Sequence, residues 1–238
     1  VGFKIYPKKP DGGLVTTGSV GVSREKTILK AMALAIKYDK AVAVHCDDPE
    51  IIAREGNPAR AECSYVEKVI RLADEIQGVK VVICHVSCQE SAELILAAQE
   101  SGAYIALELA PHYLWFDDTG YNWNPRIDPI FYHCFNKIRG PEHRLYLVGL
   151  LAEENPLIFI GSDSACHSEL EKLEKKLGGL PSNQEMVAVI VTLATQLGLP
   201  ENQVANLLSF NAARFFGIPV SERLVEYKLE EKFDDLTY

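Results

Sequence analysis

In the stretch Ala41-Val-Ala-Val-His-Cys-Asp-Asp-Pro49, a short apolar run is followed by a polar cluster that begins at His45. An apolar run of this length, without alternation, is typical of a parallel strand that is buried on both faces. A second apolar run, at residues 79–85, also ends on a histidine, His85. The two runs predict a parallel sheet that presents polar side chains at one edge.

Strand and helix patterns alternate on both sides of these two runs. Further strands are predicted at residues 2–6, 103–109 and 157–162. Helices are predicted from apolar spacing and turn residues at 23–38, 59–76, 87–100, 141–152, 200–208 and 211–216, with one more starting near 182. Two of these helices are expected to open on capping boxes, Ser87 with Glu90 and Ser182 with Glu185.

The alternation predicts an α/β fold with parallel strands and crossover helices. Polar residues follow the strand ends, which is where TIM-like (β/α)8 barrels carry their active sites. Five strands are counted where a closed barrel needs eight, so we expect an incomplete barrel that lacks N-terminal strands. Residues 1–220 would form this barrel part, and 221–238 an extension that could start a small β-domain. Residues 111–140 show no clean periodicity and are interpreted as a long functional loop.

Composition narrows the class of protein further. The 238 residues, of which 47% are hydrophobic, suffice for one sizeable core. A net charge of −9 argues against a nucleic-acid or anionic-membrane partner, and no apolar run is long enough to span a bilayer. The six cysteines form no short disulfide framework and the first residues do not resemble a signal peptide, so we expect free thiols and a cytoplasmic location.

The strand-end residues suggest a metal site. Strands in a sheet lie about 4.8 Å apart, so His45 and His85 could share one divalent ion such as zinc. Asp163 could relay a proton from metal-activated water to a leaving nitrogen, or merely cap the next helix. His167 either faces the same edge or lies on a surface loop. Lys4 is either an edge residue or, once carboxylated by carbon dioxide, an anionic ligand that bridges two ions.

Eight short motifs, taken in order, resemble the dihydroorotase family within the amidohydrolase superfamily of binuclear metal hydrolases. They are Gly2-Phe-Lys-Ile-Tyr6, Val44-His-Cys46, Arg60 with Glu62, Ile83-Cys-His-Val-Ser87, Glu108-Leu-Ala-Pro-His-Tyr-Leu114, Gly161-Ser-Asp-Ser-Ala-Cys-His167, Gly179-Leu-Pro-Ser182 and Asn211-Ala-Ala-Arg-Phe-Phe-Gly217. The motifs cover most of the chain, and their shared order makes the resemblance specific.

The resemblance implies a role for each candidate residue. It makes Lys4 the carboxylated bridging lysine, His45 and His85 ligands of the second metal, Asp163 a ligand of the first metal and the general acid/base, and His167 and Asn136 substrate-binding residues. Cys84 and Glu108 match positions that hold a third zinc ion in animal-type members, together with the histidine matching His45. Cys84 could instead be a buried small hydrophobe, Glu108 a hydrogen-bond partner, and His112 a support for a neighbouring ligand.

Two departures from the family pattern matter. The family's first strand supplies a His-x-His pair to the first metal, and no such pair occurs in this sequence. We therefore expect the chain to be a fragment that begins at the fourth strand of the barrel and is inactive by itself. In the aspartate motif, Ser164 and Cys166 replace the usual second and fourth residues, and only Cys166 is unusual among bacterial members.

The expected activity is zinc-dependent interconversion of N-carbamoyl-L-aspartate and dihydroorotate in pyrimidine biosynthesis, with two zinc ions in the complete enzyme. A homo-oligomer is expected, in which aspartate carbamoyltransferase could also take part. One alternative is a hydantoinase or allantoinase, which shares the lysine, histidines and aspartate. The other is a non-catalytic dihydroorotase-like subunit that scaffolds aspartate carbamoyltransferase, which the missing His-x-His pair would favour.

Overall fold

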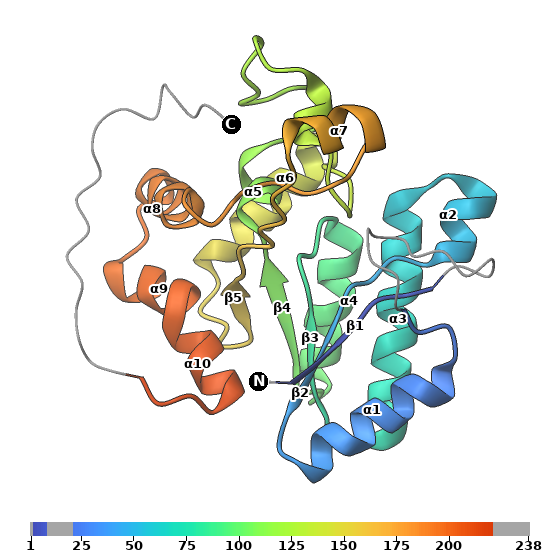
Figure 1. The fold of residues 1–238 in the computed structure, drawn as a ribbon. Helices are drawn as coiled ribbons and strands as arrows, with labels where there is room; N and C mark the ends of the chain where they lie inside the picture. Colours follow the sequence, from blue (N-terminus) through green and yellow to red (C-terminus); the bar gives the residue numbers. More distant parts are fainter. Residues whose placement is uncertain (1, 9–20, 221–238) are drawn as a thin grey trace.

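The computed structural model describes residues 2–8 and 21–220 and is built on one parallel sheet (Figure 1). Its strands are β1 (Gly2–Ile5), β2 (Ala41–Val44), β3 (Lys80–Ile83), β4 (Ile105–Leu109) and β5 (Ile158–Ile160). They lie in the order β1-β2-β3-β4-β5, and each neighbouring pair is parallel. The carboxyl ends of all five strands therefore lie at one edge of the sheet.

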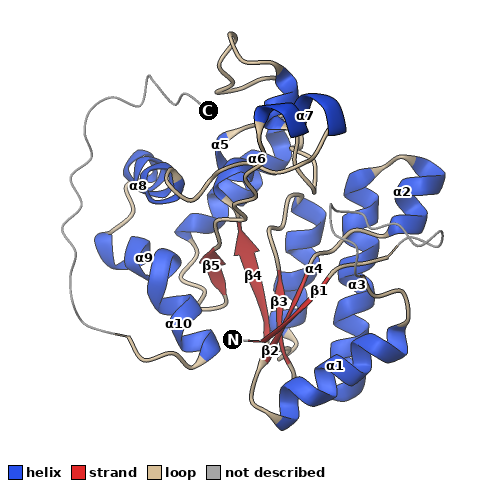
Figure 2. Ribbon diagram, in the orientation of Figure 1, coloured by secondary structure: helices blue, strands red, loops and turns tan. Residues whose placement is uncertain are grey.

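Helices connect the strands and flank the sheet (Figure 2). They are α1 (Glu25–Lys37), α2 (Pro49–Glu55), α3 (Pro58–Ile76), α4 (Gln89–Glu100), α5 (Pro111–Trp115), α6 (Pro141–Gly149), α7 (Glu169–Lys175), α8 (Met186–Leu197), α9 (Glu201–Ala205) and α10 (Asn211–Phe216). Short 3₁₀ turns at Pro129–Tyr132 and Leu150–Ala152 and a π-turn at Asn206–Phe210 complete the order.

The two faces of the sheet differ in the size of their side chains. Branched residues such as Val42 and Ile83 face α1, α3 and α4 and form most of the core with them. The opposite face carries small residues such as Ala41 and Ala106, against which Phe215 of α10 packs in a second cluster. Side chains alternate between the two faces along a strand. The small-residue face therefore also carries those residues after each strand that continue this alternation on its side.

The predicted strands and most of the predicted helices are confirmed, with each strand lying within its expected range. Two helix starts were wrong. The residue that caps α4 is Cys88, because the Ser87 hydroxyl binds the buried carboxylate of Glu62 instead. Helix α8 begins only at Met186, since the Ser182 hydroxyl donates to the carbonyl of Ser162 at 2.5 Å.

The remaining expectations concern the predicted loop, the cysteines, membrane spans and the C-terminal residues. The segment 111–140, interpreted as a long functional loop, contains two short helical elements, α5 and a 3₁₀ turn. The six cysteines are free, as predicted. Among the described residues, no helix is long and apolar enough to cross a membrane. The predicted extension at 221–238 lies outside the described residues.

Candidate active site at the carboxyl ends of the strands

The histidines that follow β2 and β3 meet directly. His45 Nδ1 lies 3.0 Å from His85 Nε2, and both side chains are almost fully buried. Burial, reinforced by the neighbouring His45, lowers the pKa of His85 well below its ordinary value. His85 is therefore neutral near pH 7, which is the form of imidazole that binds a metal ion.

The backbone bends sharply at two of the predicted site residues. His85 has a φ of 42° and Asp163 a φ of 45°, so both lie in the left-handed region. Residues other than glycine rarely adopt this conformation, and where they do the surrounding structure must hold them there. The bend turns each side chain away from the direction that a continuing strand would give it.

Asp163 lies between two ionisable neighbours. Its Oδ2 is 3.5 Å from Nε2 of His112, a ring that burial keeps neutral by lowering its pKa to about 3. Burial, together with the nearby carboxylate of Glu108, raises the pKa of Asp163 to about 7. A carboxyl group with such a pKa exchanges protons readily at neutral pH, as a general acid or base must.

Glu108 is held close to the sheet. Its Oε1 accepts a hydrogen bond of 3.2 Å from the amide of His85. Gly161 makes room for it, because a Cβ at that position would lie 2.5 Å from the carboxyl carbon of Glu108. Burial raises the pKa of Glu108 although the ammonium of Lys4 opposes that shift.

Lys4 lies on β1 on the small-residue face, opposite Ala43, and only part of its side chain reaches solvent. Its Nζ lies 5.2 Å from the centre of the Tyr6 ring. Burial works against the charge, but Cys84, Tyr6 and Glu108 raise the pKa of Lys4. Lys4 on β1, Cys84 directly after β3 and Glu108 on β4 thus interact electrostatically across the sheet.

Of the predicted ligands, His45 and His85 lie together, whereas Asp163 pairs with His112, a residue expected only to support a neighbouring ligand. Within the described ranges, the only three His, Cys, Asp or Glu side chains whose ligand atoms all lie within 4.8 Å are elsewhere, at Cys63, Cys88 and Glu90. The edge of the sheet at which the strands end, called the rim below, does hold buried ring nitrogens that lack a hydrogen-bond partner. They are His45 Nε2, His85 Nδ1 and both nitrogens of His112. Unpaired buried nitrogens are costly unless another group binds them, so their chemistry fits a cation such as zinc.

The two predicted substrate residues bind different parts of the protein. Asn136 is buried, and its Nδ2 donates to Glu62 Oε2 at 2.6 Å and to the carbonyl of Cys46 at 3.3 Å. Its Oδ1 has no hydrogen-bond partner. His167 is half-buried, and its Nε2 donates to the carbonyl of Gly178 at 3.2 Å.

Sequence reasoning placed Glu62 in a motif but missed that it organises the site's support. Its buried carboxylate accepts from Arg139 Nη2 at 3.1 Å, from the amide of Ser87 at 3.0 Å and from Asn136. Burial works against ionisation, but Arg139, Ser87 and Asn136 together lower the pKa of Glu62. A glutamate on an otherwise apolar helix face was the only sequence signal for this role.

A second missed residue is Asp47, two positions after His45. It is buried, and its Oδ2 lies 3.8 Å from His45 Nε2. Burial raises the pKa of Asp47, while His45 acts in the opposite direction. Carboxylates beside a metal-binding histidine commonly orient its ring, and the polar cluster after β2 was a signal that could have found this one.

Lys172 of α7 anchors the segment before Asn136. The lysine is buried, and its Nζ donates to the carbonyls of Phe131 and His133 at 3.2 Å each. Helix α7 itself starts on a capping box made by Ser168 and Glu171, which the sequence analysis did not single out.

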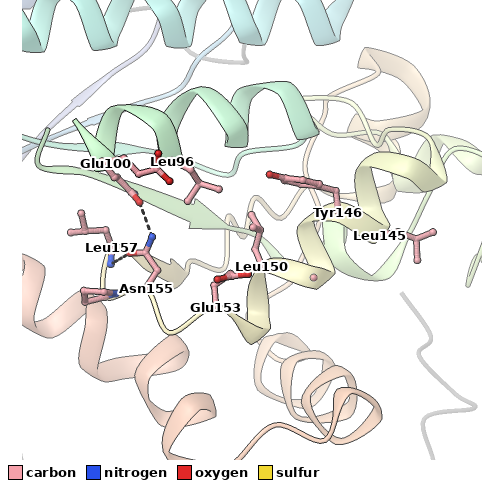
Figure 3. A pocket seen from close by; sticks show the side chains of 11 residues that line it. Leu96, Glu100, Leu145, Tyr146, Leu150, Glu153, Asn155 and Leu157 are labelled. Atoms are coloured by element: carbon pink, nitrogen blue, oxygen red, sulfur yellow. Dashed lines mark hydrogen bonds between the residues drawn. The ribbon is translucent and has the colours of Figure 1, made fainter. Parts of the chain in front are cut away.

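A large cavity lies at the opposite end of the sheet (Figure 3). Its volume is about 780 Å³, and it is lined by Leu96, Tyr146, Leu150 and Leu157, among others. Two of its lining residues are joined by a hydrogen bond of 2.7 Å from Asn155 Nδ2 to Gln99 Oε1. Because Leu157 precedes β5, this cavity is separate from the rim that holds His45 and Asp163.

Fold and site together define a barrel-type α/β protein whose ionisable side chains gather where parallel strands end. The sequence profile of the amidohydrolase family matches residues 8–222, and the chain belongs to that family.

Individual relatives agree with this assignment. A dihydroorotase from Bacillus licheniformis is 24% identical over an alignment that covers 94% of this chain and 57% of that protein. The structure of dihydroorotase from Saccharomyces cerevisiae with 5-fluoroorotic acid superposes with a TM-score of 0.77 at 18% identity, over 92% of this chain and 60% of that one. A D-hydantoinase structure gives 0.72 at 18% identity, over 89% and 49%. At such identities the structural likeness shows the fold alone, and the chain spans only 49–60% of these relatives.

Proposed function

We propose that the chain forms part of a cyclic amidohydrolase that interconverts dihydroorotate and N-carbamoyl-L-aspartate. The observation that carries the proposal is the group of buried imidazole nitrogens without a hydrogen bond at the rim where Asp163 also lies. The order of the sequence motifs supports the substrate, as do the relatives named dihydroorotase.

The amidohydrolase family is typically metal-dependent. Lys4, in carboxylated form, His45, His85 and Asp163 are the residues that would hold two zinc ions, and Cys84 and Glu108 those that would hold a third. When bound, zinc would polarise the ring carbonyl and lower the pKa of water at the site. Asp47 would keep the His45 ring in place.

The chain's own residues would move the proton. Asp163 would accept it from the attacking water and deliver it to the ring nitrogen as the C–N bond breaks. The reverse sequence closes N-carbamoyl-L-aspartate to the ring. His167 would donate to the substrate carboxylate after exchanging its present bond to the Gly178 carbonyl, and Asn136 would offer its unpaired Oδ1 to a ring N–H.

A hydantoinase is the second candidate, since a D-hydantoinase structure matches the fold nearly as well as the yeast dihydroorotase. The experiment compares hydrolysis of dihydroorotate, hydantoin and allantoin by the protein in its natural form, with zinc supplied. We expect the highest kcat/KM for dihydroorotate, because only this substrate brings a carboxylate for His167 to bind. A preference for hydantoin would contradict the dihydroorotase assignment.

Zinc binding can be tested without turnover. We expect His85→Ala to lower the zinc retained after equilibrium dialysis, because it removes one of two ring nitrogens that lie 3.0 Å apart. His143→Ala is the matched control, since His143 lies on α6 and pairs with Glu90 instead. Equal zinc retention by both variants, with unchanged circular dichroism, would argue against the proposed site.

A further inference from the structure

Two cysteines outside the rim face each other across adjacent helices. Cys63 lies on α3 and Cys88 caps α4, and their sulfur atoms are 3.8 Å apart. Cys88 is fully buried, whereas Cys63 is half-buried and therefore accessible to small solutes.

The surroundings of the two sulfurs are unequal. Cys88 Sγ lies 3.5 Å from Glu62 Oε1 and 3.1 Å from Ser91 Oγ. The hydrogen bond from Cys88 lowers the pKa of Cys63, with a further contribution from Ser91. The same hydrogen bond, together with burial, raises the pKa of Cys88. An accessible thiol whose pKa is lowered, beside a buried thiol, is the arrangement expected of a reactive cysteine pair.

We propose that Cys63 and Cys88 form an oxidisable dithiol, in which hydrogen peroxide attacks Cys63 and Cys88 then closes a disulfide between α3 and α4. Glu90, whose carboxylate lies near both sulfurs, is exposed and lies 3.4 Å from His143. The surrounding structure therefore holds the two sulfurs together but does not hold Glu90 with them.

The reaction balances in two steps. Cys63 first releases its proton, and its sulfur attacks one oxygen of the peroxide, so that the O–O bond breaks and a sulfenic acid forms; the hydroxide that leaves takes up the released proton as water. Cys88 then attacks the Cys63 sulfur, so that the S–S bond forms and the S–O bond breaks, and the Cys88 proton leaves with the departing hydroxide as water. In sum, two thiols and one peroxide give one disulfide and two waters.

The disulfide would act on the support of the site. Glu62 and Ser87 are chain neighbours of the two cysteines, and Glu62 accepts hydrogen bonds from the amides of both Ser87 and Cys88. Oxidation removes the S–H of Cys88, whose sulfur lies 3.5 Å from Glu62 Oε1, and fixes the two segments to each other. The pair is therefore placed to transmit oxidation to the carboxylate that holds Arg139 and Asn136.

The test treats the full reduced chain with hydrogen peroxide and maps the products by mass spectrometry without reductant. We expect the mass to fall by two hydrogen atoms and tryptic peptides 61–68 and 81–126 to be linked. Since the second peptide also contains Cys84, fragment ions must place the bond on Cys88.

Variants separate the two steps. Cys88→Ser should leave Cys63 as a sulfenic acid that dimedone traps, and should slow alkylation of Cys63 by iodoacetamide at neutral pH. Cys63→Ser should abolish both the linkage and the dimedone adduct, whereas Cys166→Ser, which removes an exposed cysteine, should change neither. Two results would overturn the proposal. One is that, in the chain without substitutions, Cys63 stays unlinked and is oxidised beyond sulfenic acid. The other is that Cys84 forms the disulfide.

Discussion

Asp163→Asn is expected to lower the turnover of dihydroorotate by about 10²- to 10⁴-fold, the range over which a general acid or base contributes. The amide keeps the size of the side chain but cannot accept or release a proton. Steady-state rates in both directions, measured on the protein in its natural form, check this result. Both should fall together, because one group serves the forward and the reverse proton transfer.

Asp118→Asn is the matched control, since Asp118 is exposed and follows the end of β4 by nine residues. It should leave both rates unchanged. If Asp163→Asn retained more than a tenth of the rate while its circular dichroism stayed native, Asp163 would not be the proton-transferring group. In that case the fold assignment would stand and only the mechanism would fail.

Glu62→Ala should lower the free energy of unfolding by about 3–5 kcal/mol, the usual cost of breaking a buried ion pair from one side. The change leaves the guanidinium of Arg139 buried without its carboxylate and removes the acceptor for Ser87 and Asn136. Urea denaturation followed by circular dichroism measures the difference.

Glu67→Ala provides the control on the same helix, because Glu67 is exposed. Surface substitutions of this kind usually stay within about 0.5 kcal/mol. The double variant Glu62→Met with Arg139→Met should recover part of the loss, since it removes both buried charges at once. A cost below 1 kcal/mol for Glu62→Ala would mean that Arg139 finds another partner.

The fold was predictable because its signals are local. The apolar runs that became β2 and β3 stand out from their flanks, and their alternation with helical patterns allows only a parallel sheet. The helix starts were less predictable, because a serine that could cap a helix can serve a tertiary contact instead. Ser87 does so with Glu62, a residue 25 positions away in the sequence.

The site could be predicted only as a set of residue types at strand ends. His45 and His85 meet because adjacent parallel strands bring their carboxyl ends together. The role of Glu62 depends on Arg139, 77 positions later, and no local pattern reports such a pairing. The left-handed backbone at Asp163 could not be predicted from the sequence either, because the neighbouring structure imposes it rather than the residue type.

The attachment of the segment before Asn136 should resist changes in ionic strength. Lys172 binds two main-chain carbonyls in a buried position, so dissolved ions have no carboxylate to compete for and little access. The pair between Arg71 and Glu25 is about half exposed on both sides and would be screened by salt. In concentrated salt, surface charge pairs of this kind would therefore weaken, while the hydrogen bonds from Lys172 to the carbonyls of Phe131 and His133 would persist.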